Sequence, residues 1–539
     1  MKSFIFTCYN FLVFTFIFIF SVNATENVNE TTKLVTQPLS TTQIDQLAKR
    51  VMNTFSIPGV AIGVIEHGKI VHAQGYGLKE ISTNNVVDTN TIFKIASNSK
   101  AFTTAALAIL VDEGKLKWQG KVVDYLPDFK MSDEWLTKHL TIIDLLTHRS
   151  GLGLGAGDLM LWPEPSSFTR EQVLHNLRYL NVSSEFRASY AYDNLLYIVA
   201  GQLIPAVTGM SWQNFVQSRI MQPLAMNHCF AGSVPKKQHS FLAKPHLFVN
   251  GKLTVVERNK QKELVSAAAG GVQCSLNDML LWANVFLHQG KYGNNKQLFS
   301  LKQFNELWKG RTIMPVSKRA YDWDYTHFSQ YALGWRLNDV NGFLRVHHTG
   351  SLSGMYSSVS FFPELDLGIV ILTNQQSSNA RNAMMYSIMK SYLPLTHQQH
   401  SKDWVAEMLK YEKKTAVQNA HDFVLTNENK YHLSKYKLTN YVLTFNDNWL
   451  GDFSINLTTQ HGIQHLQIHS KRVVKFVGDL TAVAEDKFLV TWQDRTLEAD
   501  VFAQFIRDSN YKIIKLKLIP VSKNIDFSYD FQDLNLQIK

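Results

Sequence analysis

The spacing of hydrophobic positions changes several times along the chain and predicts successive stretches of helix and strand. Residues 41–55 are apolar along one helical face, which predicts an amphipathic helix. Residues 59–66 and 69–77 are two apolar runs of strand length around a short glycine-containing turn, which predicts a β-hairpin. Runs of strand length return between residues 331 and 373. The long region between these two sets of strands is mostly helical or loop-like.

Strands at both ends of residues 41–395, with helices between them, predict an α+β domain. We expect an antiparallel sheet flanked by helices, with a helical insertion and a cleft where the insertion meets the sheet. Residues 93–114 include a strongly helical stretch that ends at Gly114, and we expect this helix to pack on one face of the sheet.

The pattern changes after residue 395. Residues 396–424 carry many charges at helical spacing and predict an exposed connecting helix. Residues 425–539 contain repeated short apolar strands, which predict a separate all-β, barrel-like domain.

The N-terminus carries a targeting pattern. Lys2 precedes an apolar run that reaches Val22, and small residues follow, so residues 1–24 are expected to be a secretory signal cleaved after about Ala24. An uncleaved membrane anchor is the alternative. Residues 25–40 are polar and predict a flexible leader. The signal predicts an exported protein, periplasmic or secreted.

Composition narrows the class of protein. The chain has 539 residues, 45% of them hydrophobic and 18% charged, which is typical of a globular protein with two or three domains. The net charge of +10 is spread without a long basic block, so we expect no nucleic-acid partner. Cys229 and Cys274 follow the signal; they could form a disulfide or remain two buried thiols.

The first candidate for chemistry is Ser97-Asn98-Ser99-Lys100, at the start of the predicted 93–114 helix. Residues three apart share a helical face, so the Lys100 amine can reach the Ser97 hydroxyl. A buried lysine with a lowered pKa can take the proton of a serine and so activate it as a nucleophile. An ordinary capped helix is the alternative. The same spacing of serine and lysine also begins at Ser233, Ser387, Ser434 and Ser509.

Two further motifs follow in the chain. Tyr192 can act as a proton relay, or as a base where cations lower its pKa, and Asn194 can hold a substrate amide. A turn that caps the following helix is the alternative. The second motif is His348-Thr349-Gly350-Ser351, which is expected to lead from one strand into the next.

Glycine in the second motif allows a close approach of the backbone to substrate, and the Ser351 N–H can join the Ser97 N–H in an oxyanion hole. A plain hairpin turn with a solvated histidine is the alternative for this motif.

Together these motifs resemble those of the serine β-lactamase and penicillin-binding-protein superfamily, in its class C-like branch with Tyr-x-Asn. The resemblance covers residues 41–395. It includes FKIASNSKAFTTAAL, LLTHRSGL, AYDNLLYIVAGQLI, AAAGGVQCSLNDMLLWANVFLHQG, HHTGSLSGMYSSVSFFPE and GIVILTN. Spacings of 95 residues from Ser97 to Tyr192 and 156 from Tyr192 to His348 agree with it. The tail, above all NIDFSYDFQDL, resembles a β-domain appended to some of these hydrolases.

The resemblance implies an acyl-enzyme mechanism with no metal or organic cofactor. In it Lys100 and Tyr192 deprotonate Ser97, Tyr192 protonates the leaving group, and Asn194 and His348 position the substrate. Penicillin-recognising members carry lysine where this chain has His348. Members with histidine there include D-aminopeptidase-like and esterase-like enzymes.

We therefore expect a hydrolase for D-amino-acid peptides, with a small-molecule or peptide substrate and the cell wall as one source of it. A carboxylesterase, a weak β-lactamase and a non-catalytic penicillin-binding-like envelope protein are the alternatives.

Overall fold

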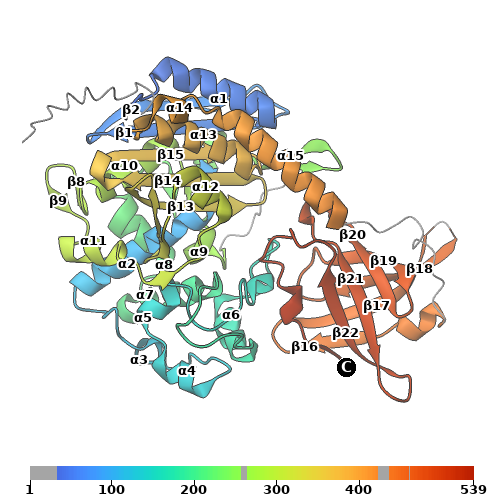
Figure 1. The fold of residues 1–539 in the computed structure, drawn as a ribbon. Coiled ribbons are helices and arrows are strands. Elements are labelled where there is room, and N and C mark those ends of the chain that lie inside the picture. Colours follow the sequence, from blue (N-terminus) through green and yellow to red (C-terminus); the bar gives the residue numbers. More distant parts are fainter. Residues whose placement is uncertain (1–32, 257–263, 423–435, 461) are drawn as a thin grey trace, which may run out of the picture.

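The computed structural model describes residues 33–256, 264–422, 436–460 and 462–539 (Figure 1). The predicted signal, residues 1–24, lies outside this part of the chain, as do the first half of the predicted leader and the first residues of the predicted β-domain.

One antiparallel sheet of eight strands is the framework of the first domain, in the order β10-β11-β12-β13-β14-β15-β1-β2. β1 and β2 form the predicted hairpin, and β1 pairs with β15 on its other side. The α+β class is confirmed. β1 and β15 are buried on both faces, which is why their apolar runs are continuous rather than alternating. The strands are β1 (Gly59–Glu66), β2 (Lys69–Gly77), β10 (Thr312–Ile313), β11 (Ser329–Tyr331), β12 (Arg336–Val340), β13 (Phe343–Leu352), β14 (Met355–Phe362) and β15 (Leu367–Thr373).

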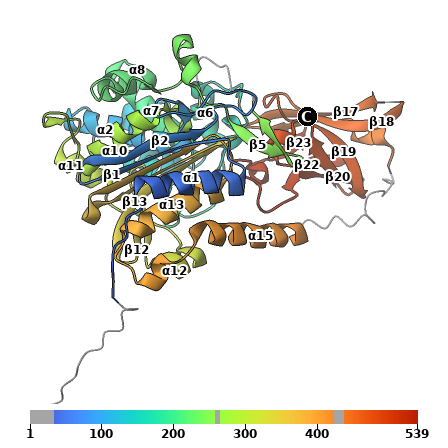
Figure 2. The ribbon, with the colours of Figure 1, turned by 90° about the horizontal axis from the view of Figure 1, so that it is seen from above.

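Helices cover both faces of the sheet (Figure 2). α1 and α13 lie on one face, with α15 packed on α13, and α10 covers β1 and β15 on the other. The helix after Ser97, α2, was predicted to cover the sheet, but it packs on α10 instead. Phe102 of α2 stacks on Trp282 of α10, with ring centroids 4.2 Å apart. Almost every side chain of α2 is apolar or small, so the helix is buried on all sides. The helices are α1 (Thr41–Phe55), α2 (Ser99–Asp112), α10 (Leu276–Leu287), α13 (Ser378–Tyr392) and α15 (Trp404–Asp422).

The helical insertion is built around α7, which contacts α2, α5, α8 and α9. Within the described ranges no single helix is long and apolar enough to cross a membrane; α7 and the bent segment after it reach that length only together. The remaining helices are α3 (Val122–Tyr125), α4 (Glu134–His139), α5 (Ile142–Leu146), α6 (Arg170–Asn176), α7 (Leu195–Thr208), α8 (Trp212–Val216), α9 (Ala267–Gly270), α11 (Leu301–Leu307), α12 (Lys318–Asp324) and α14 (His397–His400).

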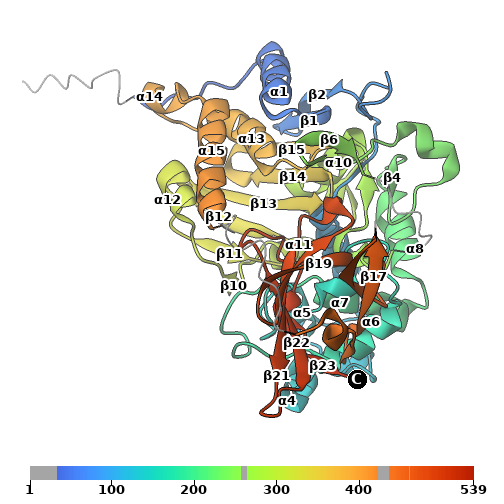
Figure 3. The same cartoon turned by 90° about the vertical axis from the view of Figure 1, so that its right-hand side faces the viewer.

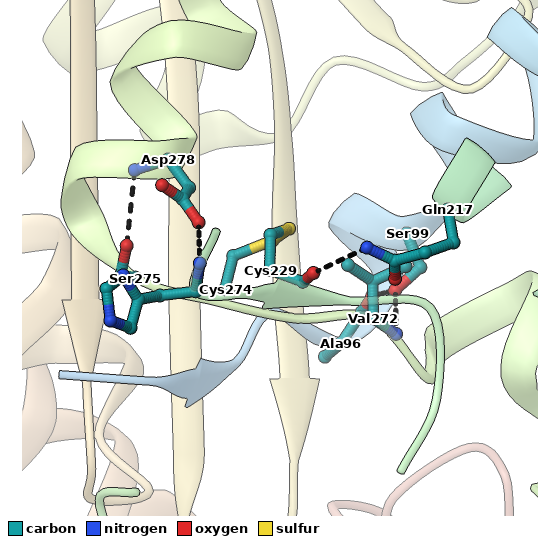
Figure 4. Close-up of a disulfide and its surroundings, with 9 residues drawn as sticks. Ala96, Ser99, Gln217, Cys229, Val272, Cys274, Ser275 and Asp278 are labelled. Carbon is teal, nitrogen blue, oxygen red and sulfur yellow. Dashed lines mark hydrogen bonds between the residues drawn. A yellow bond between two sulfur atoms is a disulfide. The ribbon is translucent and has the colours of Figure 1, made fainter. Parts of the chain in front are cut away.

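Three short strands form a small sheet in the order β3-β7-β4, with β7 in the middle. A disulfide joins Cys229 of β4 to Cys274 of β7, which settles the two alternatives for these cysteines (Figure 4). The short strands are β3 (Phe93–Lys94), β4 (Cys229–Phe230), β5 (His246–Val249), β6 (Lys252–Val255), β7 (Gln273–Cys274), β8 (Lys291–Tyr292) and β9 (Lys296–Gln297).

The C-terminal strands close into a barrel, because β16 pairs with both β17 and β23 (Figure 3). This confirms the all-β, barrel-like prediction. Tyr441, Phe488 and Phe505 are buried and pack ring against ring in its core. The strands are β16 (Thr444–Asp447), β17 (Gly451–Gln460), β18 (Ile463–Ser470), β19 (Val477–Ala484), β20 (Lys487–Trp492), β21 (Val501–Arg507), β22 (Ile513–Pro520) and β23 (Leu536–Ile538).

The barrel docks against the insertion of the first domain, beside α6 (Figure 1). Asn176 donates a hydrogen bond to the carbonyl oxygen of Trp449 at 2.7 Å. The Arg472 guanidinium lies 3.9 Å from the centre of the Phe168 ring. Polar and cation–π contacts therefore join the two domains, and their surfaces meet close to the predicted cleft.

Candidate active site

A cavity of about 1000 Å³ lies where the sheet, the insertion and the barrel meet. Five of the eight predicted site residues line it: Ser97, Tyr192, Asn194, Thr349 and Ser351.

Ser97 sits in a tight turn between β3 and α2. Residues Ala96–Asn98 form one turn of 3₁₀ helix, and Ala96 has a φ of 49°, a left-handed conformation that is strained for alanine. The Ser99 hydroxyl fixes this turn, because it donates to the Ala96 carbonyl at 2.6 Å and accepts from the Val272 N–H at 2.9 Å (Figure 4). The turn that carries Ser97 is thus held by hydrogen bonds of the neighbouring Ser99.

Gly350 allows β13 to approach this turn. A Cβ atom at Gly350 would lie 2.1 Å from the Ile95 carbonyl oxygen and 3.0 Å from the Ala96 Cβ atom. The close approach predicted for this glycine is therefore an approach to the nucleophile's own turn, and it brings Ser351 to the same cavity.

Lys100 is fully buried, with its amine next to Ser97. The distance from Lys100 Nζ to Ser97 Oγ is 3.3 Å. Nζ also donates to Asn194 Oδ1 at 2.6 Å and to the Ala269 carbonyl oxygen at 3.0 Å. Burial lowers the pKa of Lys100 from 10.5 to about 7, aided by the charge of Arg336. A neutral amine that donates to two carbonyl oxygens keeps its lone pair for the Ser97 proton.

Tyr192 lies over Lys100, with Nζ 4.8 Å from the ring centre. Burial raises the pKa of Tyr192 well above 10, and the opposing influences of Arg336 and the Ser97 hydroxyl do not offset this. Arg336 lowers the pKa of Tyr192, as the sequence analysis expected of a nearby cation, but desolvation outweighs this effect. The Tyr192 hydroxyl is therefore protonated at neutral pH, whereas a large share of Lys100 is neutral.

Asn194 is held from two sides. Its carbonyl oxygen accepts from Lys100, and its amide nitrogen donates to Asp158 Oδ2 at 2.8 Å. Asp158 is fully buried. The amide lines the cavity, where it was predicted to hold substrate, and it also orients the base.

His348 differs most from its predicted place. The motif lies within β13 rather than in the turn, which follows at Gly354 with a φ of 75°. The His348 ring is 1% exposed and is not part of the cavity lining. Its Nε2 lies 3.0 Å from the Tyr331 hydroxyl, and burial lowers its pKa well below 6.5. The neutral His348 ring lies outside the cavity lining. The structure therefore does not place this side chain in contact with substrate, in contrast to the prediction.

Arg336 is the cation that sequence reasoning missed. It lies in β12, opposite His347 in β13, and its Nη1 donates to the Thr349 hydroxyl at 3.3 Å. Its Nε is buried without a hydrogen-bond partner, and no carboxylate among the described residues forms an ion pair with it. Only strand pairing brings Arg336 to Thr349, so no local motif marks it. The cavity wall thus contains a mostly buried guanidinium that has no carboxylate partner among the described residues.

The barrel supplies part of the cavity wall. The barrel residues concerned lie between β18 and β19, in the turn after β20 and in the loop after β22: Lys475, Thr496, Leu497, Glu498, Asn524, Asp526, Phe527, Ser528 and Tyr529.

This fold, with a serine beside a buried lysine and a buried tyrosine, is that of the β-lactamase-fold serine hydrolases. A family profile described as Beta-lactamase matches residues 44–392, and the chain belongs to this family. A second profile, described as a domain of unknown function (DUF3471), matches residues 427–538.

Curated relatives agree with this membership. Unguisins hydrolase ungD' of Aspergillus campestris is 29% identical over 391 residues, which are 70% of each chain. Protein flp of Staphylococcus aureus is 26% identical over 341 residues, which are 62% of this chain and 63% of flp.

Two solved structures show the same fold. The octameric penicillin-binding protein homologue from Pyrococcus abyssi has a TM-score of 0.54 at 18% identity and covers 93% of this chain and 100% of its own. A class C β-lactamase from Rhodobacter sphaeroides has a TM-score of 0.52 at 20% identity. The match covers 69% of this chain and 99% of the β-lactamase chain.

Proposed function

We propose that this protein hydrolyses amide bonds of D-amino-acid peptides through an acyl-enzyme on Ser97. The observation that carries the proposal is the setting of Lys100. Its amine lies 3.3 Å from the Ser97 hydroxyl, and burial lowers its pKa to about 7, so that a large share is neutral at physiological pH.

The reaction proceeds in two steps. Neutral Lys100 takes the Ser97 proton as Ser97 Oγ attacks the substrate carbonyl carbon. The oxyanion is expected between the N–H groups of Ser97 and Ser351, which both line the cavity. Tyr192 donates its proton to the leaving amine and then receives the proton that Lys100 took from Ser97. Water then takes the place of the leaving amine and attacks the acyl carbonyl carbon. The proton transfers run in reverse order, and Ser97 leaves with its hydroxyl restored.

Arg336 favours a substrate with a free carboxylate near the scissile bond. A guanidinium presents donors in a planar fork that matches a carboxylate, and Arg336 lines the cavity beside Thr349, to which its Nη1 donates. Arg336 thus offers the permanent charge that neutral His348 does not. A carboxypeptidase-type cut of a peptide fits this arrangement, and the cavity of about 1000 Å³ has room for several residues. Two relatives of this chain are named unguisins hydrolases, which supports a hydrolase activity.

A comparison of substrates tests the proposal. We expect a peptide that ends in D-Ala-D-Ala with a free carboxylate to be cleaved with a higher kcat/KM than its C-terminal amide. A p-nitrophenyl ester and nitrocefin serve as probes for esterase and β-lactamase activity. A higher kcat/KM on esters than on every peptide tested would contradict the peptidase assignment, and no turnover of any substrate would favour a non-catalytic protein.

A further inference from the structure

The C-terminal barrel contacts the Asp158 carboxyl group through the Ser528 hydroxyl. Ser528 belongs to the barrel segment that lines the cavity, and its Oγ donates to Asp158 Oδ2 at 2.9 Å. The same oxygen accepts from the Asn194 amide nitrogen at 2.8 Å. A single carboxyl oxygen is therefore shared by the barrel and the active site.

The hydrogen bond between this oxygen and Asn194 determines which way the Asn194 amide group faces. Because Asp158 Oδ2 accepts from the Asn194 NH₂ group, the Asn194 carbonyl faces the other way and accepts from Lys100 at 2.6 Å. A rotated amide would present its NH₂ group to the Lys100 amine, and two donors would then oppose each other. The position of Asp158 thus bears on the hydrogen bonding of the base.

The barrel also fixes the main chain on both sides of Asp158. Asp530 accepts from the N–H groups of Gly157 at 2.5 Å and Leu159 at 3.2 Å. The adjacent ring of Phe527 meets the Tyr192 ring edge-on, with centroids 5.6 Å apart. All of these contacts fall within residues 527–530, so one short barrel segment reaches both the base and the proton donor.

We propose that Asp158 and Ser528 are positioning residues that orient Asn194, and through it Lys100, which makes the barrel a working part of the active site. This role assigns a function to the domain that otherwise carries none. It rests on the proposed function of Lys100 as the base. A barrel that is only attached to the hydrolase domain would leave the chemical step unaffected.

Acylation of the full-length protein by a fluorophosphonate tests the proposal. We expect Ser528→Ala to lower the acylation rate at saturating probe roughly fivefold, the effect of one neutral hydrogen bond, with the apparent binding constant unchanged. Ser528→Thr keeps the hydroxyl and should restore the rate to within about twofold. Ser522→Ala removes a hydroxyl that accepts from the Asn524 N–H in the loop after β22 and is the matched control.

Variants of Asp158 separate positioning from packing. Asp158→Asn keeps an acceptor oxygen for both donors and should stay within about fivefold of the parent protein. Asp158→Leu keeps the shape but no acceptor and should lose on the order of a hundredfold. Equal rates for Ser528→Ala and the parent protein, equal losses for the two Asp158 variants, or losses that simply follow the melting temperature would each overturn the proposal.

A spectroscopic readout keeps this test apart from the test of the proposed function. If the parent protein does not react with the probe, the proposed function fails, and the side-chain amide signal of Asn194 in ¹⁵N-labelled protein decides the positioning role. That signal, assigned by its loss in Asn194→Asp, should shift in Ser528→Ala and stay in place in Ser522→Ala. An unshifted signal in Ser528→Ala would refute the role.

Discussion

The pH dependence of acylation follows from the burial of Lys100. A fall in pKa from 10.5 to about 7 corresponds to roughly 5 kcal/mol in favour of the neutral amine. About half of Lys100 is then neutral at pH 7, about a tenth at pH 6 and about a hundredth at pH 5. We therefore expect the rate of fluorophosphonate labelling to rise about tenfold per pH unit up to pH 7 and to level off above about pH 8.

Replacing the base tests whether Lys100 is the group that titrates. Lys100→Met keeps the length and removes the amine, so labelling should fall between about a hundredfold and ten thousandfold, and the limb below pH 7 should vanish. Stopped-flow or gel-based labelling from pH 5 to pH 9 measures both effects. A flat profile for the parent protein, or the same limb in Lys100→Met, would refute the reasoning.

Asp193 needs its own control, because burial raises its pKa to about 7 as well. The negative charge of Asp193 raises the pKa of Lys100, so Asp193→Asn should move the limb to lower pH and leave its slope unchanged. Disappearance of the limb in Asp193→Asn would identify the carboxyl as the titrating group instead.

Three further variants address the rest of the site. Arg336→Gln should reduce the preference for a free carboxylate over an amide by about 10- to 100-fold in kcat/KM, and an unchanged preference would exclude Arg336 from substrate binding. Gly350→Ala should cost about 3 kcal/mol or more in unfolding free energy, because its Cβ would meet a carbonyl oxygen at 2.1 Å, whereas Gly153→Ala, with 3.4 Å of room, should unfold like the parent protein in a urea titration. Removing the disulfide in a Cys229→Ala/Cys274→Ala variant opens a loop of 45 residues and should cost roughly 4 kcal/mol; equal melting of variant and parent would contradict this.

Local patterns were sufficient where the chemistry lies within a few residues of chain. Ser97 is in the 3₁₀ turn that leads directly into α2 and Lys100 is in the first turn of α2, so a spacing of three residues brings them into contact. The alternating and continuous apolar runs predicted the α+β sheet and the separate barrel, because burial on one or two faces determines these patterns.

Features that depend on tertiary contacts could not be predicted in this way. Arg336 reaches Thr349 only because β12 pairs with β13 in one register. The pKa of Tyr192 rises because packing removes water from its hydroxyl, and no neighbour in the sequence reveals this. Ser528 meets Asp158 across 370 residues of chain, through the docking of the barrel on the first domain.

The central claim is that Ser97 is the nucleophile, and mass spectrometry of the intact protein after fluorophosphonate treatment tests it most directly. We predict one adduct per chain, located on the peptide that contains Ser97, and no adduct in Ser97→Ala. An adduct that persists in Ser97→Ala, or that maps to another serine, would contradict the account.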